Sequence, residues 1–276
     1  MRQKIVTIFI VLFTLMSVRL FGQDTIIYDN PSKNVIIGDK VAILEDVNNK
    51  LSINEVIQSK YFTNKRQQVP NLQISNSAFW IKMIITNHTN RNYLALNLEY
   101  PTIDSVTFIN LLPSGDYAKI VTGEFVPYYY REFKHQSYIF KLNILPSETR
   151  VFFIKVIASE QIQLPLTLGT TQSISDAIDI NDLIFGLYAG IILVMLLYNL
   201  FIYFTVRDRT YLYYVFYILF VGLSQACLQG YAQRFFYPDS AFLANAMMIW
   251  VPAISGIFGI SFINVFIVTY IFTSYK

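Results

Sequence analysis

The feature that most constrains this chain is its membrane-length apolar second part. Between residues 184 and 275 only five side chains are charged, namely Arg207, Asp208, Arg209, Arg234 and Asp239. The run 184–206 would be about 34 Å long as a helix, enough to cross a bilayer. A second run, 211–229, follows after so few residues that the two must form an antiparallel hairpin. A third span is expected at 248–272, with Pro252 kinking it near its start.

Charge and aromatic residues predict the orientation of these spans. Arg207 and Arg209 lie in the short turn of the hairpin, and the positive-inside preference assigns this turn to the cytoplasm. Tyrosines and phenylalanines bracket the turn at 203–214 and recur at 231–237. Because such rings concentrate at membrane–water interfaces, we expect an inner and an outer aromatic belt.

The N-terminal residues 1–22 have the layout of a secretory signal peptide. Arg2 and Lys4 precede an apolar core at 5–18, and Gly22 ends a plausible cleavage region. The alternative is an uncleaved anchor, although this core is shorter than the roughly 20 residues that a span needs. Either way, the residues from Asp24 to Asp182 are expected outside the cytoplasm.

This exported part, 23–170, shows the period-2 alternation of antiparallel sheet. The alternating apolar sets are Phe79, Ile81, Met83 and Ile85; Leu94, Leu96, Leu98 and Tyr100; Tyr138, Phe140, Leu142 and Ile144; Phe152, Ile154 and Val156; and Ile162, Leu164, Leu166 and Leu168. Turn-forming residues separate them, and only 52–60 looks helical, with Ser52 as N-cap and Glu55 completing a capping box. The pattern predicts an all-β, jelly-roll-like sandwich, joined by a linker at 171–183 to the transmembrane region 184–276.

Composition and motifs argue against catalysis and against nucleic-acid binding. Residues 23–182 hold 14 Lys and Arg against 16 Asp and Glu, so no basic surface for nucleic acid is expected. His88 and His135 lie in unrelated segments without cysteine partners, and we expect both on the surface rather than on a metal. Cys227 is expected as a small packing residue. No metal or cofactor is predicted.

The run Tyr128, Tyr129, Tyr130 and Arg131 is the candidate ligand site of the exported part. If it is a strand, Tyr129 and Arg131 share one face and Tyr128 and Tyr130 the other. A ring stacking on a sugar, with Arg131 binding a hydroxyl or carboxylate, would use one of these pairs. The alternative is that the tyrosines shield a sheet edge. Trp80 has the same two interpretations, ligand contact or core packing.

Several small or polar residues lie inside the expected spans. They are Gly186 and Gly190 in a G-x-x-x-G pattern, Asn199, Gln225, Ser255 with Gly259, and Asn264. Helix packing and interhelical hydrogen bonds explain such residues without a transport role. The spans contain no carboxylate or lysine, which weakens the hypothesis of a proton-coupled transporter.

The combination resembles a known family. The segments "GLYAG", "LVMLLYN" and "RDRTYLYY" are similar to the 7TMR-DISM family, bacterial seven-transmembrane receptors with diverse intracellular signalling modules. The matching positions are Gly186, Tyr188, Gly190, Tyr198, Asn199, Asp208, Tyr211, Leu212 and Tyr214. Upstream, "NSAFWIKMIITNHT" and "GEFVPYYYREF" resemble the family's second type of extracellular domain, a carbohydrate-binding-like jelly roll.

The resemblance implies the sensory input portion of a bacterial inner-membrane receptor, with its N-terminal domain in the periplasm. Its expected partners are a periplasmic small molecule or glycan, the lipid bilayer, and a cytoplasmic signalling partner or a C-terminal output domain. The family has seven spans and this sequence shows three, so it is either a fragment or a truncated relative. Two other functions stay open, a membrane-tethered carbohydrate-binding or envelope-scaffold protein without signalling, and a transporter subunit.

Overall fold

The computed structural model describes residues 24–112 and 115–274, and the predicted signal peptide lies outside them. The strands are β1 (Ile26–Tyr28), β2 (Val35–Ile36), β3 (Ala42–Asp46), β4 (Asn71–Ile74), β5 (Ala78–Asn87), β6 (Tyr93–Leu98), β7 (Ser105–Leu111), β8 (Tyr117–Thr122), β9 (Tyr138–Asn143), β10 (Thr149–Ile157), β11 (Gln161–Gln163) and β12 (Leu166–Gly169). The helices are α2 (Ile53–Gln58), the 3₁₀ turn η1 (Tyr128–Tyr130), α3 (Thr171–Val206), α4 (Arg209–Leu228), α5 (Tyr231–Phe236) and α6 (Ala241–Ser274).

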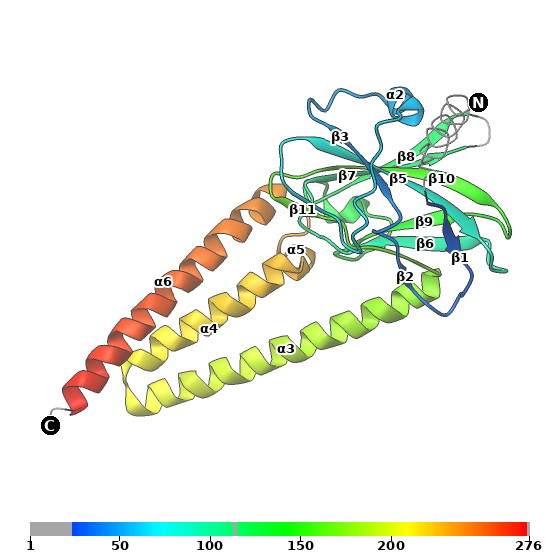
Figure 1. Ribbon diagram of the computed structural model, residues 1–276. Coiled ribbons are helices and arrows are strands. Elements are labelled where there is room, and N and C mark those ends of the chain that lie inside the picture. The colour runs from blue at the N-terminus through cyan, green and yellow to red at the C-terminus, as the bar shows by residue number, and fades with distance from the viewer. Residues whose placement is uncertain (1–23, 113–114, 275–276) are drawn as a thin grey trace, which may run out of the picture.

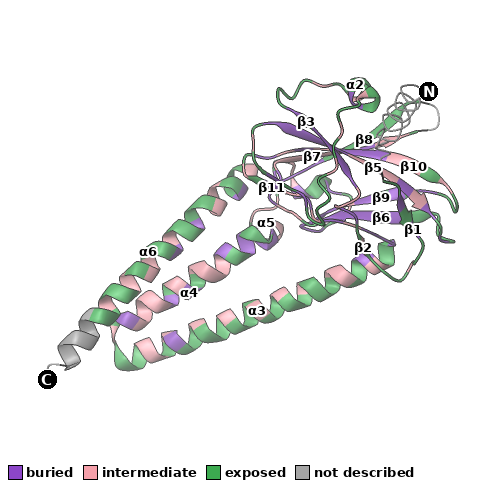
Figure 2. Ribbon diagram, in the orientation of Figure 1, coloured by how far each residue is buried: buried purple, intermediate pink, exposed green. Residues whose placement is uncertain are grey.

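The exported part is a β-sandwich, as the alternation predicted. One sheet has the order β1-β5-β10-β7-β8, with β3 also paired to β5, and the facing sheet has the order β2-β12-β6-β9. All five predicted apolar sets enter the core between the sheets, with Tyr100 half-buried at its margin. Because alternate residues of each strand point to opposite faces, a correct alternation predicts which side chains form this core. Figure 2 shows the buried residues concentrated in these strands.

A second, smaller apolar cluster covers the outer face of the larger sheet. Trp80 and Phe153 project from this face and pack beneath Val56 of α2. The helix begins where the sequence predicted, because Ser52 and Glu55 form the reciprocal capping box. Trp80 is only 3% exposed and its indole Nε1 donates to Asp46 Oδ2 at 3.4 Å. Core packing is therefore the correct interpretation of Trp80.

The sandwich continues into the first membrane helix without a flexible connection. Strand β12 ends at Gly169, Thr170 is the N-cap, and α3 begins at Thr171. Thr170 and Ser173 satisfy each other's backbone amides, and Asn34 Nδ2 donates to Ser173 O at 2.9 Å. A Cβ on Gly169 would lie 2.2 Å from Asn34 Oδ1 and 2.8 Å from Ser173 Oγ, so a larger residue would displace the side chains that hold this junction. The expected linker 171–183 is thus helical, because its first turn is capped and held by the sandwich.

Among the described residues, three helices are long and apolar enough to span a membrane, α3, α4 and α6. They extend from the sandwich in the same general direction, and the α3–α4 turn lies with the C-terminus at the far end (Figure 1). The predicted hairpin is confirmed, and two of the helices begin before the predicted spans. Helix α3 starts 13 residues before Ile184, and α6 starts at Ala241 rather than at residue 248, with Pro252 inside the helix.

Close packing between these helices involves Gly222 and also Gly259, which the sequence analysis had included among the packing residues. A Cβ on Gly222 of α4 would lie 2.9 Å from Ile192 of α3, and one on Gly259 of α6 would lie 3.2 Å from the Tyr217 ring. An added Cβ on Gly186 or Gly190 meets nothing within 4 Å. In the part of the chain that the structure describes, Gly186 and Gly190 lie on an exposed face of α3, so their role in helix packing stays a prediction.

Candidate functional site at the junction of sandwich and helices

The tyrosine run forms a 3₁₀ turn, so the predicted strand was wrong. Tyr130 N donates to Pro127 O at 3.1 Å and Arg131 N to Tyr128 O at 3.2 Å, which closes two tight turns. The face assignment changes accordingly. Tyr128 and Arg131 are 8% and 6% exposed, whereas Tyr129 and Tyr130 are each 75% exposed. The exposed pair is therefore two adjacent rings, and the buried pair is a ring with the guanidinium.

Arg131 ties the sandwich to the helical part. Its Nη1 donates to His135 O at 3.0 Å and Gln136 O at 3.2 Å, and its Nη2 donates to Gly123 O at 3.2 Å. The fourth bond goes from Nη2 to Gln233 Oε1 of α5, at 3.1 Å and 102 residues away in sequence. The guanidinium also lies 4.9 Å from the centres of the Tyr128 and Tyr138 rings.

Gln233 of α5 both accepts a hydrogen bond from the sandwich and donates one to it. Its Nε2 donates to Glu124 O at 3.0 Å while its Oε1 accepts from Arg131. Tyr128 N donates to Pro238 O at 2.8 Å, which fixes the chain just after α5 to the same part of the sandwich. Burial, followed by the charges of Glu160 and Asp104, raises the pKa of Glu124 to about 7. This carboxyl is therefore sensitive to pH near neutrality.

A second polar connection is centred on Asp182 of α3. It accepts from Tyr231 Oη at 2.8 Å, from Arg234 Nη1 at 2.9 Å and from Gln136 Nε2 at 3.3 Å. Arg234 also donates to Gln136 Oε1 at 3.1 Å. One carboxylate thus joins α3, α5 and the sandwich. We call Arg131, Gln136, Asp182, Gln233 and Arg234 the junction cluster.

His135 belongs to the surroundings of this cluster, so its predicted surface position was wrong. It is 7% exposed, and its Nδ1 accepts from Ser137 N at 3.1 Å, which leaves Nε2 directed at Asp182 Oδ1 over 3.6 Å. Burial lowers the pKa of the imidazole and keeps it neutral. His88 is exposed, as predicted. No group of metal-binding side chains occurs among the residues that the structure describes.

A glycine lets the helical part approach the sandwich this closely. Gly230, between α4 and α5, has φ of +76°, and a Cβ there would lie 2.7 Å from Pro101 and 2.9 Å from Gln136. Both the backbone conformation and the contact distance exclude a larger residue. The turn into α5 is therefore seated against the sandwich beside the junction cluster.

An open cleft of about 610 Å³ lies next to the junction cluster. Its walls come from the β6–β7 loop and the segment 135–137 before β9 on the sandwich side, and from α3, α4 and α5 on the other. Gln225, which we predicted to pack between helices, is exposed and lines this cleft. Asn199 is buried and donates within its own helix, to Met195 O at 2.8 Å.

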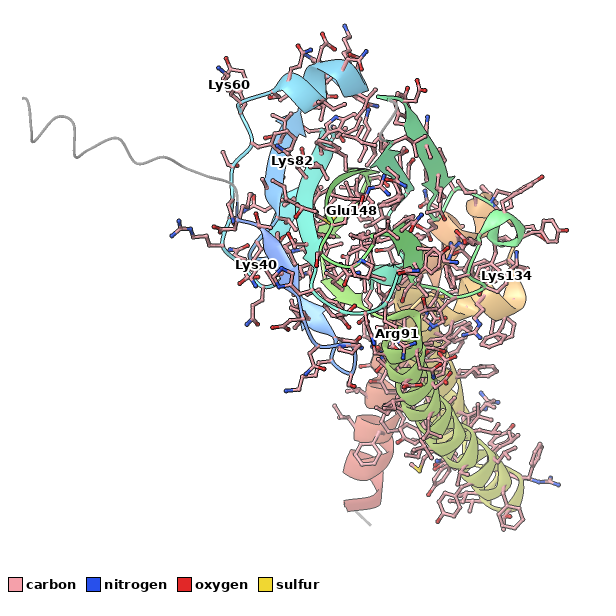
Figure 3. The ribbon with its side chains drawn as sticks, turned by 90° about the vertical axis from the view of Figure 1, so that its right-hand side faces the viewer. Lys40, Lys60, Lys82, Arg91, Lys134 and Glu148 are labelled. Carbon is pink, nitrogen blue, oxygen red and sulfur yellow. The ribbon has the colours of Figure 1, made fainter. Side chains whose placement is uncertain are left out.

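The two exposed rings lie away from this cleft, on the segment that carries η1. Tyr129 and Tyr130 meet edge to face with ring centres 5.8 Å apart, and Lys134 Nζ lies 4.8 Å from the centre of the Tyr129 ring. Figure 3 shows Lys134 projecting on the α5 side, away from Lys40 and Lys60. These rings are the part of the predicted ligand site that remains accessible.

Sequence reasoning missed Asp182, Gln233 and Arg234. The available signal was the scarcity of charge, since Asp182 and Arg234 are two of the few charged residues beside the spans. A charge at the edge of an apolar segment requires a partner or water. Nothing in the sequence pairs these two residues, because they are separated by 52 positions.

Fold and junction define a membrane-embedded sensory module, an exported β-sandwich docked onto transmembrane helices. Residues 38–170 match the family described as 7TMR-DISM extracellular 2, and residues 181–275 match 7TM diverse intracellular signalling. The chain belongs to the 7TMR-DISM family. It is the sensory portion of a membrane receptor, and both matched modules are sensory or transmembrane rather than catalytic. No curated protein sequence matches the chain.

Solved structures resemble the chain only distantly. A glucuronidase with specificity for decorated arabinogalactans aligns at 10% identity and TM-score 0.27, over 52% of this chain and 18% of that one. A tailspike domain of bacteriophage CBA120 aligns at 15% identity and TM-score 0.24, over 47% of this chain and 17% of that one. A carbohydrate-binding module of the β-sandwich superfamily aligns at 7% identity and TM-score 0.22, over 51% of this chain and 53% of that one.

Proposed function

We propose that the sandwich binds a periplasmic ligand and that the junction cluster passes the change to the membrane helices. The observation that carries this proposal is the buried Arg131, which bonds the sandwich through three carbonyls and α5 through Gln233. Each hydrogen bond from a charged donor contributes roughly 1.5–3 kcal/mol. A shift of η1 would therefore change the position of α5 rather than be absorbed locally.

The ligand of this receptor is proposed to contact the exposed pair Tyr129 and Tyr130. Two solvent-facing rings offer stacking surface to a sugar or another flat ligand. They directly precede Arg131 in the chain, so ordering of the rings would act on the residue that holds α5. The proposal places the helices in the bacterial inner membrane, the sandwich in the periplasm, and a signalling partner or output domain in the cytoplasm.

The alternative of a tethered scaffold without signalling is less consistent with the junction. A scaffold requires only attachment, which α3 already supplies through its direct continuation from β12. The additional buried bonds to α5, and the shared carboxylate of Asp182, create a second connection to a different helix. Two connections to two helices allow the sandwich to change their relative position, which is what a receptor requires.

The coupling is tested by measuring the distance between sandwich and α5 in the full chain in nanodiscs. Spin labels at Lys60→Cys and Phe236→Cys, in a Cys227→Ala background, are expected to give one narrow distance distribution. Gln233→Leu removes both side-chain bonds across the boundary and is expected to broaden or shift it. Gln172→Leu, an exposed glutamine on α3, is the control. An unchanged distribution in Gln233→Leu would contradict the coupling.

Ligand binding is tested separately, with N-acetylglucosamine, maltotriose and galacturonate as probes. A probe that binds the wild-type chain is expected to bind the Tyr129→Ala, Tyr130→Ala double variant at least tenfold more weakly, because stacking is lost. Tyr61→Ala, which removes a ring that is 82% exposed elsewhere, is expected to bind normally. Equal binding by the double variant would place the site elsewhere on the sandwich.

A further inference from the structure

We propose that the cleft between the sandwich, α3 and α4 binds an organic cation that carries an apolar group. The cleft encloses about 610 Å³, within the range of pockets that hold small organic ligands. It is separate from the exposed rings of η1, so this would be a second site. Its walls combine a carboxylate, several aromatic rings and an apolar surface that continues into the spans.

Charge determines which kind of ligand the cleft accepts. Among the described residues that line it, Glu99 alone carries a formal charge at neutral pH, because His135 is neutral and no Lys or Arg is present. Asn97 Nδ2 donates to Glu99 Oε1 at 2.8 Å, while Oε2 accepts no hydrogen bond from the described residues. Glu99 therefore has one oxygen held in place and one available to a ligand.

In the described part of the chain, no positively charged side chain lines the cleft beside the Glu99 carboxylate. Glu99 is exposed at the cleft, and the partial desolvation that the cleft walls impose raises the pKa of its carboxyl above the usual value. The nearby Arg234 does not supply the missing positive charge, since its guanidinium is bonded to Asp182 and Gln136. A bound cation would stabilise the ionised form of Glu99, so binding is expected to strengthen as pH rises through its pKa.

Aromatic rings line the wall that faces the sandwich. Phe185 of α3 stacks on Tyr231 of α5 with ring centres 3.7 Å apart, and Tyr188 tilts against Phe185 at 6.1 Å. Tyr100 lies on the sandwich side of the same cleft. Ammonium groups are attracted to exposed ring faces by the ring quadrupole, so a cleft lined by these rings and one carboxylate favours a cation over a neutral or anionic group.

The remaining wall favours an apolar group on the same molecule. Ile184 of α3 and Val221 and Leu228 of α4 line the cleft, and these residues belong to the apolar spans. Helices α3 and α4 meet at their far turn and diverge toward the sandwich (Figure 1). An amine with an aryl or alkyl group would thus place its ammonium by Glu99 and its apolar part between the two helices.

Occupancy of the cleft would also act on the junction cluster, a consequence that rests on the proposed function. Gln136 lines the cleft and also bonds Asp182 and Arg234, and Tyr231 lines it and donates to Asp182. A ligand against these side chains would change how α3, α5 and the sandwich are held together. Binding itself does not depend on this consequence.

The test uses the full chain in nanodiscs and three probes of matched shape, 2-phenylethylamine, 2-phenylethanol and phenylacetate. The protonated amine is expected to bind at least tenfold more tightly than the alcohol or the carboxylate in saturation-transfer NMR. Glu99→Gln is expected to weaken amine binding at least tenfold, and Tyr188→Ala to weaken it severalfold. Glu132→Gln, at an exposed carboxylate outside the cleft, is the control. Trp80 emission, in a Trp250→Phe background, verifies that each variant is folded.

Two results would overturn the proposal. They are equal binding of the three probes, and wild-type affinity for the amine in Glu99→Gln. Nanodiscs with and without phosphatidylethanolamine distinguish the sources of the cation, because a lipid ammonium that occupies the cleft would compete with the probe and a soluble ligand's site would be unaffected. The spin-label distances in Gln233→Leu test the coupling independently, so failure of one proposal is distinguishable from failure of the other.

Discussion

Removing the guanidinium of Arg131 should destabilise the sandwich strongly, although the residue lies outside its sheets. The side chain donates to three backbone carbonyls and to Gln233, and it is 6% exposed. Arg131→Ala leaves these acceptors without their partner in a buried place. The contributions of the four hydrogen bonds are not additive, and water enters the space that the side chain leaves. We therefore expect the free energy of unfolding to fall by about 3–5 kcal/mol, less than the sum of the four separate bonds.

The measurement is denaturant unfolding of the full chain in detergent, followed by tryptophan emission. The chain has two tryptophans, and Trp250→Phe leaves Trp80, which is buried in the sandwich, as the reporter. Arg131→Lys keeps the charge but loses the planar fork, so about half of the loss is expected to remain. Arg91→Ala, at an exposed arginine of the same domain, should change the free energy of unfolding by less than about 0.5 kcal/mol.

The outcome that would refute this reasoning is specific. If Arg131→Ala unfolds within about 0.5 kcal/mol of the wild-type chain, the four bonds do not stabilise the domain beyond what water supplies. Arg131 could not then be the residue that transmits a shift of η1 to α5, and the proposed coupling would have to run through Asp182 alone.

Three further predictions concern topology, pH dependence and helix packing. Reporter fusions after Asp182 and Arg209 are expected to read outside and inside; the reverse order would contradict the assigned orientation. The pKa of Glu124 is raised from 4.5 to about 7, so its stabilising contribution is complete below pH 4.5 and is lost as pH rises toward 7. Glu124→Gln should flatten this part of the stability–pH curve, and an unchanged slope would assign it to other groups. Gly222→Val should lower the thermal midpoint in detergent while Gly186→Val leaves it unchanged, because only Gly222 faces Ile192 closely; equal effects would refute the helix contact.

Much of the fold was predictable because it depends on local periodicity. Phe79, Ile81 and Met83 alternate along one strand and all enter the core. The Ser52–Glu55 capping box starts α2 at the position that the sequence predicted. In both cases the deciding interactions involve neighbours in sequence or a common apolar core, which the pattern of residue types encodes.

The junction could not be predicted in the same way. Three consecutive tyrosines have no period, and the strand assumed for them predicted Tyr129 and Arg131 on one face. The observed turn instead buries Arg131, whose bond to Gln233 spans 102 positions. His135 likewise looked like a residue among solvated charges, but it is buried and its Nε2 lies 3.6 Å from Asp182 of α3. Contacts at such separations are set by tertiary structure, which overrides local pattern.

Because β12 continues directly into α3, a small change of angle at the start of this helix becomes a large displacement at its far end. Its 36 residues, at about 1.5 Å each, reach about 54 Å from the sandwich to the far turn. A tilt of about 5° imposed at Thr170 would therefore displace the Arg207 end by about 5 Å, a full helical pitch. The same rigidity fixes an angle: one residue inserted after Thr170 would turn every later side chain of α3 by about 100° around the helix axis. The number of residues between β12 and α3 therefore determines which side chains of α3 face the lipid.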